Sequence, residues 1–231
     1  MRILAIAALI SSTTTLIACS PLAPQPDHSK YFILTPITAS APGSSQPNPG
    51  SASQLTLGIG PIDFPDYLRR PELVTLSNAN EIDLSDEKRW AEPLDKNFSR
   101  ILTENLTKLL DTKRIEKFPW SHNTSVDYQV IVDVQRFDTS STGQSQLIAR
   151  WTIKDGRNGK DLYASETTAG EPVHSGETGA SVAMSNDLAA LSRDIANRIA
   201  MISEAQQRRA SSQAVAPPDH LGLALLQGSH T

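Results

Sequence analysis

The sequence has almost no cysteine and few aromatic residues. Cys19 is the only cysteine in 231 residues, and Phe, Trp and Tyr together make up 5% of the chain. A single cysteine excludes an intramolecular disulfide. The folded part must therefore be stabilised by its core alone.

Long apolar segments and an excess of one charge sign are also missing. No apolar stretch reaches the roughly 20 residues that a membrane-spanning helix needs. The formal charge is −4, with acids and bases interspersed along the chain. There is no basic stripe of the kind that follows nucleic-acid phosphates. The composition argues against a membrane-spanning protein and against nucleic acid as a partner.

Motifs that carry chemistry are incomplete. Residues 58–60 and 159–161 lack the spacing of a dinucleotide or phosphate loop, and Ser145 and Ser181 lack the second glycine of a nucleophile elbow. The histidines show no pair at metal-ligand spacing; they are His28, His122, His174, His220 and His230. We therefore expect no catalytic residues, no metal and no dissociable cofactor.

Two pairs of acidic residues leave an alternative open. Asp63 with Asp66, and Glu92 with Asp95, could in principle perform acid–base chemistry. The simpler interpretation is that they are solvated loop charges and acids at the start of a helix, where the helix dipole favours them. We favour this second interpretation and predict that the protein is not an enzyme.

The N-terminus has the layout of a secretory signal. Met1-Arg2 supplies a positive charge, and residues 3–17 are mostly apolar. The segment ends in Leu16-Ile17-Ala18-Cys19, which resembles the lipobox of bacterial lipoproteins. That resemblance implies cleavage after Ala18, a signal peptide of residues 1–18, and diacylglycerol and fatty acyl groups on Cys19. An ordinary signal peptide or a buried cysteine is the alternative.

The residue after the cysteine carries a further implication of this resemblance. Ser20 stands where an aspartate would favour retention at the inner membrane. By the lipoprotein sorting rule we expect the outer membrane, with the protein on its periplasmic face. Two or more acyl chains would make the anchoring effectively permanent.

Composition divides the mature chain into one domain with loose ends. Residues 19–30 form a Pro-containing tether, and residues 210–231 a Ser-, Ala- and Pro-containing tail. Between them we expect a domain at 31–209, interrupted by a Pro/Ser-rich insertion at about 38–53. The β-prone run 31–35 must pair with later strands to be stable.

Hydrophobic periodicity gives the elements of this domain. Alternation predicts strands at 55–59, 126–137 and 147–153, and short β-prone runs lie at 72–76, 81–84 and 162–168. Steps of three and four predict two amphipathic helices. Their apolar faces are Leu94, Phe98, Ile101, Leu102, Leu106, Leu109 and Leu110, and Met184, Leu188, Leu191, Ile195, Ile199 and Ile202.

These elements indicate an α/β fold of the α+β type. We expect one mixed, mostly antiparallel sheet with both helices packed on one face. The second helical stripe could instead be a coiled-coil seam or a partner groove, but at this length a core face is the commoner role.

The segment 61–71 combines three prolines with two aromatic residues and a leucine. Proline and the lack of alternation argue against a central strand. The segment could be a rigid connection at the sheet edge, or a contact loop, because rigid aromatics anchor interfaces well. The contact hypothesis names Phe64, Tyr67, Leu68 and Arg70.

Several segments resemble one known family in the same order. The Pro-x-Tyr-Leu-x-Arg-Pro segment at 65–71 is similar to that of the ABC-type transport auxiliary lipoproteins, the PqiC/YmbA-like family. Residues 31–36, 89–94, 136–138 and Trp151 also match. Arg69 departs from the acidic residue found in many relatives, so no charge pairing is carried over from the family at this position.

The resemblance implies a non-catalytic auxiliary or adaptor subunit of an MCE-type ABC phospholipid transport system that supports envelope integrity. Its implied partners are the membrane, through the lipid anchor, the MCE-domain tunnel protein of the same system, and further copies of itself in a homo-oligomer. An independent structural envelope lipoprotein is the alternative, and a periplasmic hydrolase a more remote one.

Overall fold

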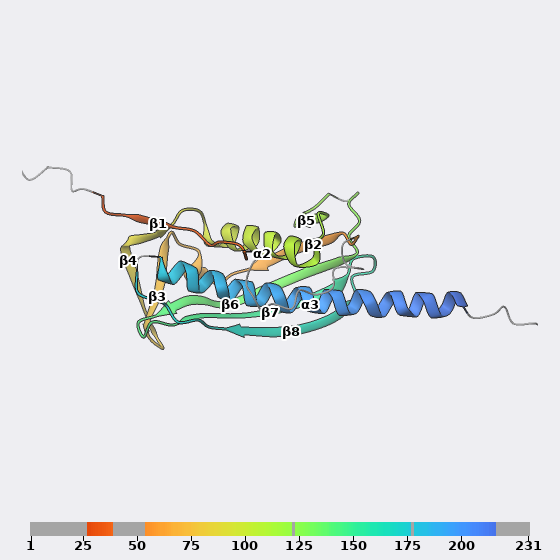
Figure 1. Ribbon diagram of the computed structural model, residues 1–231. Helices are drawn as coiled ribbons and strands as arrows, with labels where there is room; N and C mark the ends of the chain where they lie inside the picture. The colour runs from red at the N-terminus through yellow and green to blue at the C-terminus, as the bar shows by residue number, and fades with distance from the viewer. Residues whose placement is uncertain (1–26, 39–53, 122, 177, 216–231) are drawn as a thin grey trace, which may run out of the picture.

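A computed structural model describes residues 27–38, 54–121, 123–176 and 178–215 (Figure 1). Ala18, Cys19, the signal peptide and nearly all of the predicted insertion lie outside these residues. The elements are β1 (Lys30–Phe32), β2 (Leu57–Asp63), the 3-10 helix η2 (Asp66–Leu68), β3 (Glu72–Asn78), β4 (Glu81–Trp90), α2 (Leu94–Leu110), β5 (Ile115–Lys117), β6 (Tyr128–Ser140), β7 (Ser145–Asp155), β8 (Asp161–Ala169) and α3 (Gly179–Val215).

The strands form one eight-stranded mixed sheet organised around β6. The order is β1-β4-β3-β6-β2-β5, and β7 pairs with β6 and β8 on the other side. Most paired residues lie in the antiparallel ladders β6–β7, β7–β8 and β3–β4, whereas β1, β2 and β5 pair in parallel. The predicted fold class, a mostly antiparallel α/β sheet with two helices, is confirmed.

Both helices lie on one face of this sheet (Figure 1). The predicted apolar face of α2 is buried throughout, and that of α3 is buried from Met184 to Ile199. They meet the inward residues of β6 and β7, whose alternation the sequence predicts. These residues are Tyr128, Val130, Val132, Val134, Leu147, Ala149, Trp151 and Ile153, and all are buried.

Strand β2 corrects two expectations. It is not half-buried over its first residues, because Gly58 and Gly60 are buried as well as Leu57 and Ile59. It also includes Pro61, although proline argues against a central strand. Here proline is tolerated because the β2–β6 register shifts between Ile59 and Ile62, and β5 pairs only as far as Ile59.

Strand β6 departs from simple alternation near its end. The β6–β7 register shifts between Val134 and Arg136, which indicates a bulge at Gln135. Beyond it Phe137, Asp138 and Thr139 are all buried. The bulge turns a new set of side chains, including a carboxylate, into the core.

The boundaries of two predicted elements need correction. The β-prone run predicted at 81–84 continues as β4 to Trp90, and α2 begins at Leu94 after Pro93. At the other end, α3 continues past the predicted boundary at residue 209 to Val215. Within the described ranges, no helix is long and apolar enough to cross a membrane.

Candidate functional site

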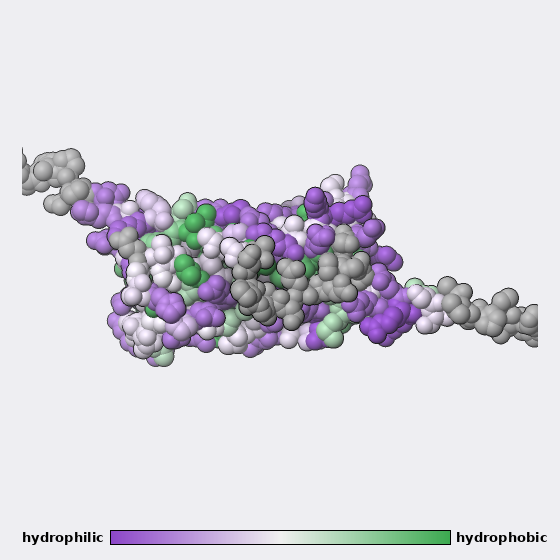
Figure 2. All heavy atoms as spheres, viewed as in Figure 1, coloured by the Kyte–Doolittle hydropathy of each residue, from purple (hydrophilic) through white to green (hydrophobic). Residues whose placement is uncertain are grey.

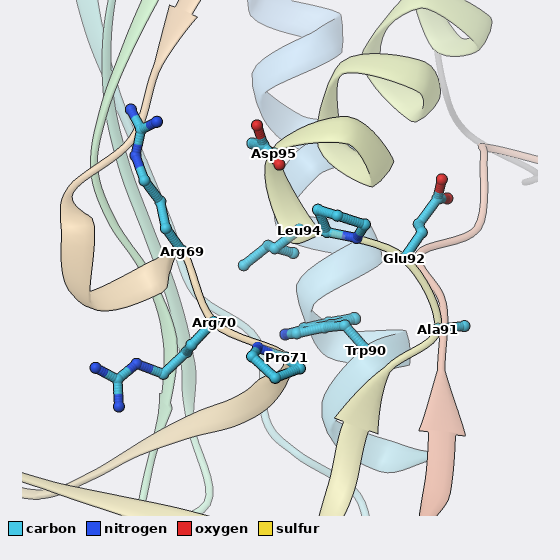
Figure 3. Close-up of a pocket in the computed structure, with 9 residues that line it drawn as sticks. Arg69, Arg70, Pro71, Trp90, Ala91, Glu92, Leu94 and Asp95 are labelled. Atoms are coloured by element: carbon cyan, nitrogen blue, oxygen red, sulfur yellow. The ribbon is translucent and has the colours of Figure 1, made fainter.

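A pocket of about 440 Å³ lies where the η2–β3 connection faces the start of α2 (Figure 3). Two backbone hydrogen bonds hold its walls together: the Trp90 amide donates to the Pro71 carbonyl at 2.7 Å, and the Ala91 amide to the Phe32 carbonyl at 2.9 Å. The lining residues are Arg69, Arg70, Pro71, Trp90, Ala91, Glu92, Pro93, Leu94 and Asp95. Three segments of the family resemblance, near 32, 71 and 90, therefore converge here.

The floor of the pocket is apolar and rigid. Trp90 and Leu94 are buried, and Figure 3 shows the Trp90 ring beside Pro71 with Leu94 directed into the gap. Pro93 occupies the N-cap position of α2 and makes no side-chain capping hydrogen bond. Prolines at 71 and 93 restrict the backbone on both sides of the opening. The pocket is thus preformed and suited to an apolar side chain or small apolar group.

Most of the charges around the pocket are paired with one another. Arg69 contacts Asp63 at 2.9 Å and Asp66 at 3.5 Å, and Arg100 contacts Glu92 at 2.6 Å. Arg69, which departs from the family pattern, thus pairs with acids of its own segment. The acids of both predicted pairs serve as ion-pair partners or, for Asp95, as a first-turn helix acid.

The Arg70 side chain differs from its neighbours. Its Nε atom is buried and has no hydrogen-bond partner among the described residues. In Figure 3 its guanidinium points away from the Trp90 ring. Arg70 therefore borders the pocket with its stem, while its buried N–H is unsatisfied, which is unusual in a folded protein.

A buried hydrogen-bonded group lies behind the same connection. Asp138 is fully buried and accepts hydrogen bonds from the Tyr67 hydroxyl at 3.1 Å and from Arg136 Nε at 3.0 Å. Burial raises the pKa of Asp138, and Arg136 and Tyr67 oppose that rise. Burial and the adjacent carboxylate raise the pKa of the Tyr67 hydroxyl. Tyr67 therefore remains a hydrogen-bond donor at neutral pH.

The residues of the contact hypothesis fall into two groups. Phe64 and Leu68 are 4% and 1% exposed. Phe64 packs edge-on against Phe98 with ring centroids 5.1 Å apart, so it belongs to the monomer core. This burial does not fit a contact role for Phe64 and Leu68, because the connection uses them to close the core. Tyr67 and Arg70 are partly exposed.

A second polar cluster lies between α2 and α3 and binds the N-terminal segment. The Asn105 side chain is buried; its Oδ1 accepts the Ile37 amide at 2.9 Å, and its Nδ2 donates to Ser192 Oγ at 3.0 Å. Ser185 Oγ accepts the Thr35 amide at 3.1 Å. Helical periodicity did not predict this cluster, because it assigns polar residues such as Asn105 and Ser192 to the solvent-exposed side of a helix.

The lining of the pocket offers no arrangement for nucleophilic catalysis. The described residues that line it include no serine, threonine, cysteine, histidine or lysine, and Glu92 is held by Arg100. Among the described residues, no group of three or more His, Cys, Asp and Glu side chains could hold a metal ion. The apolar floor formed by Trp90 and Leu94 could hold an apolar group.

Comparison with known proteins gives the family. Residues 37–196 match the sequence profile described as "ABC-type transport auxiliary lipoprotein component". No curated protein matches the sequence. Protein XCC0632 from Xanthomonas campestris, of the DUF330 family, has a TM-score of 0.61 at 13% identity, with 78% of this chain and 99% of that chain covered. The crystal structure of an uncharacterized protein gives 0.59 at 17% identity, covering 74% and 98%.

At these identities the structural likeness shows the fold alone. The profile match extends over more than half of the chain and confirms the resemblance drawn from the sequence segments. The protein belongs to the ABC-type transport auxiliary lipoprotein family.

Proposed function

We propose that this protein is the outer-membrane-anchored, non-catalytic adaptor subunit of an MCE-type ABC phospholipid transport system. The observation that carries the proposal is the family match over residues 37–196, since the family is one of auxiliary components of ABC-type transport. The lipobox-like Leu16–Cys19 supports the anchor, and Ser20 supports the outer membrane. The described domain supports an adaptor role, because its pocket is lined for binding.

The size of the pocket argues for an adaptor over a carrier. At about 440 Å³ it lies near the lower end of the range for small-molecule sites, about 300–1,000 Å³. The helix-covered face of the sheet is filled by side chains. We infer that phospholipid passes through the partner assembly, and that this chain holds the assembly at the membrane as a homo-oligomer.

The proposal is tested by co-purification of the tagged full-length protein with the MCE protein from envelope extracts. We expect the wild-type protein to recover the MCE protein. The Cys19→Ser variant should itself be lost from the outer-membrane fraction, because its anchor is removed. Deletion should increase detergent sensitivity. Failure to recover the MCE protein, together with unchanged detergent sensitivity, would instead favour an independent structural lipoprotein.

A further inference from the structure

Strand β5 and the residues that follow it form an exposed, cationic sheet edge. We propose that this edge binds an extended acidic segment of a partner protein, which adds to β5 as a further strand. The proposal deepens the adaptor role and rests on it for the identity of the partner. We define the β5 edge as residues 113–120.

The free backbone of β5 is the first observation. Among the strands of the described residues, β5 ends the order and pairs only with β2. The hydrogen bonds to β2 involve the Arg114 carbonyl and the Phe118 amide. In a parallel pair alternate residues face the neighbour, so Ile115 and Lys117 direct their backbone groups away from β2. No described residue pairs with that side, which leaves donors and acceptors for an added strand.

An exposed aromatic ring beside the strand is the second observation. Phe118 is 51% exposed and contacts Trp120 edge-on, with ring centroids 5.6 Å apart. Glycines of β2 make room for this pair: a Cβ at Gly58 would lie 2.6 Å from the Trp120 ring, and one at Gly60 would lie 2.9 Å from Phe118 Cβ. Gly60 also has φ +111°, which other residues rarely adopt. The aromatic pair is thus seated on a fitted surface.

The positive charges of the β5 edge are the third observation, and they indicate an acidic partner. Lys113, Arg114 and Lys117 are exposed, and no described carboxylate forms an ion pair with them, while Glu116 is the only acid among residues 113–120. Cations on a short edge strand also discourage edge-to-edge aggregation. That role alone does not explain the exposed Phe118. An acidic strand that carries an apolar side chain would form ion pairs with the cations, hydrogen bonds with the free backbone groups and an apolar contact with the Phe118 ring.

A membrane surface is the less favoured occupant of the β5 edge. Basic and aromatic residues can bind anionic lipids. However, the Trp120 ring lies against Gly58, and the free backbone groups of Ile115 and Lys117 would lose their hydrogen bonds to water in hydrocarbon. A protein strand provides partners for those groups.

The position of the β5 edge agrees with a role away from the anchor. In Figure 1 β5 lies toward the end of the sheet opposite the start of β1, and α3 extends beyond it. Figure 2 shows hydrophilic residues over this end in that view. The chain from Cys19 to Lys30 can span at most about 40 Å. An anchor at Cys19 would therefore keep the β1 end near the membrane and leave β5 available to a partner.

Selection of random decapeptides on phage against the full-length protein in detergent tests the proposal. We expect enrichment of acidic sequences that contain an apolar residue. A synthetic copy of the leading peptide should bind at least tenfold more weakly to Phe118→Ala and to the pair Arg114→Glu with Lys117→Glu. N-methylation of alternate peptide amides should abolish binding, because it removes the strand hydrogen bonds.

Tyr31→Ala is the matched control, since Tyr31 is 62% exposed on β1 at the other end; its binding should equal that of the wild type. Absence of acidic enrichment, or binding insensitive to Phe118→Ala, would overturn the proposal. A third result would also overturn it: the wild-type protein co-sediments with phosphatidylglycerol vesicles, Phe118→Ala abolishes this co-sedimentation, and no peptide binds. Loss of MCE co-purification with peptide binding intact would refute the proposed function and leave this inference standing.

Discussion

Two aspartates are fully buried in the part of the chain that the structure describes, and their surroundings differ. Asp138 on β6 accepts hydrogen bonds from Arg136 and Tyr67. Asp187 on α3 is equally inaccessible, but neither of its carboxylate oxygens accepts a hydrogen bond from a described residue. The nearby Ser145 hydroxyl donates to the Glu171 carbonyl instead.

Burial raises the pKa of both groups, but the opposing interactions are unequal. At Asp138 a guanidinium and a phenol oppose the rise. At Asp187 the dipole of the nearby Ser145 hydroxyl is the one opposing influence, the Glu171 carboxylate adds to the rise, and the pKa reaches about 6. The comparison shows that the same buried carboxylate can be a structural acceptor in one place and a cost to stability in another. The presence of a cation distinguishes the two.

Removing Arg136 should have the largest effect, because it makes the Asp138 environment like that of Asp187. Loss of one partner of a buried ion pair costs about 3–5 kcal/mol. Because the Arg136 side chain is 30% exposed, we expect Arg136→Ala to lower the free energy of unfolding by about 2–3 kcal/mol. Urea unfolding measures this. Arg150→Ala, which breaks an exposed pair with Glu166, is the control and should cost under about 1 kcal/mol.

Neutralising Asp187 should have an effect of opposite sign. The folded pKa of about 6 lies above the ordinary value of 3.8, so the folded state holds its proton more tightly than the unfolded chain. Stability from this group is present below pH 3.8 and is lost as pH rises to about 6. We expect Asp187→Asn to raise the free energy of unfolding at pH 7.5 by about 2 kcal/mol.

Urea titrations of the wild type and Asp187→Asn at pH 4.0 and 7.5 separate charge from shape. The two proteins should differ at pH 7.5 and converge at pH 4.0. An equal difference at both values would mean that the carboxylate charge is not the cause.

Removing the Tyr67 hydroxyl should have the smallest effect. Tyr67→Phe removes one hydrogen bond to Asp138 but leaves Arg136 in place, so we expect a loss of about 1 kcal/mol. Thermal unfolding should show a decrease of a few degrees. A loss as large as that of Arg136→Ala would show that the phenol, and not the cation, stabilises the buried carboxylate.

The sequence predicts the buried residues where they follow a regular period and does not predict them where that period is broken. Alternation and helical steps placed the buried faces of β6, β7, α2 and α3, because each repeats one simple period. The bulge at Gln135 breaks that period and brings Asp138 inside, and no local signal predicts it. Phe64 and Leu68 resemble surface anchors in a proline-rich segment, and only their burial in the folded core, where Phe64 packs against Phe98, reveals them as core residues.

The candidate site was predictable only in part. The family resemblance singled out the segments near 71 and 90, but the pocket exists because β3 and β4 bring them together. The unpaired edge of β5 depends on strand order, and strand order depends on contacts between residues far apart in the chain. Sequence periodicity contains no information about such contacts.

The N-terminal segment has a mechanical consequence. β1 pairs in parallel with the end of β4, and the chain beyond it is fastened to α2 and α3 through Thr35 and Ile37. A pull on the chain ahead of Lys30, directed along β1, loads these hydrogen bonds in shear, so several must yield together. Tension from an anchor at Cys19 would be distributed over both layers of the fold before it reached the pocket.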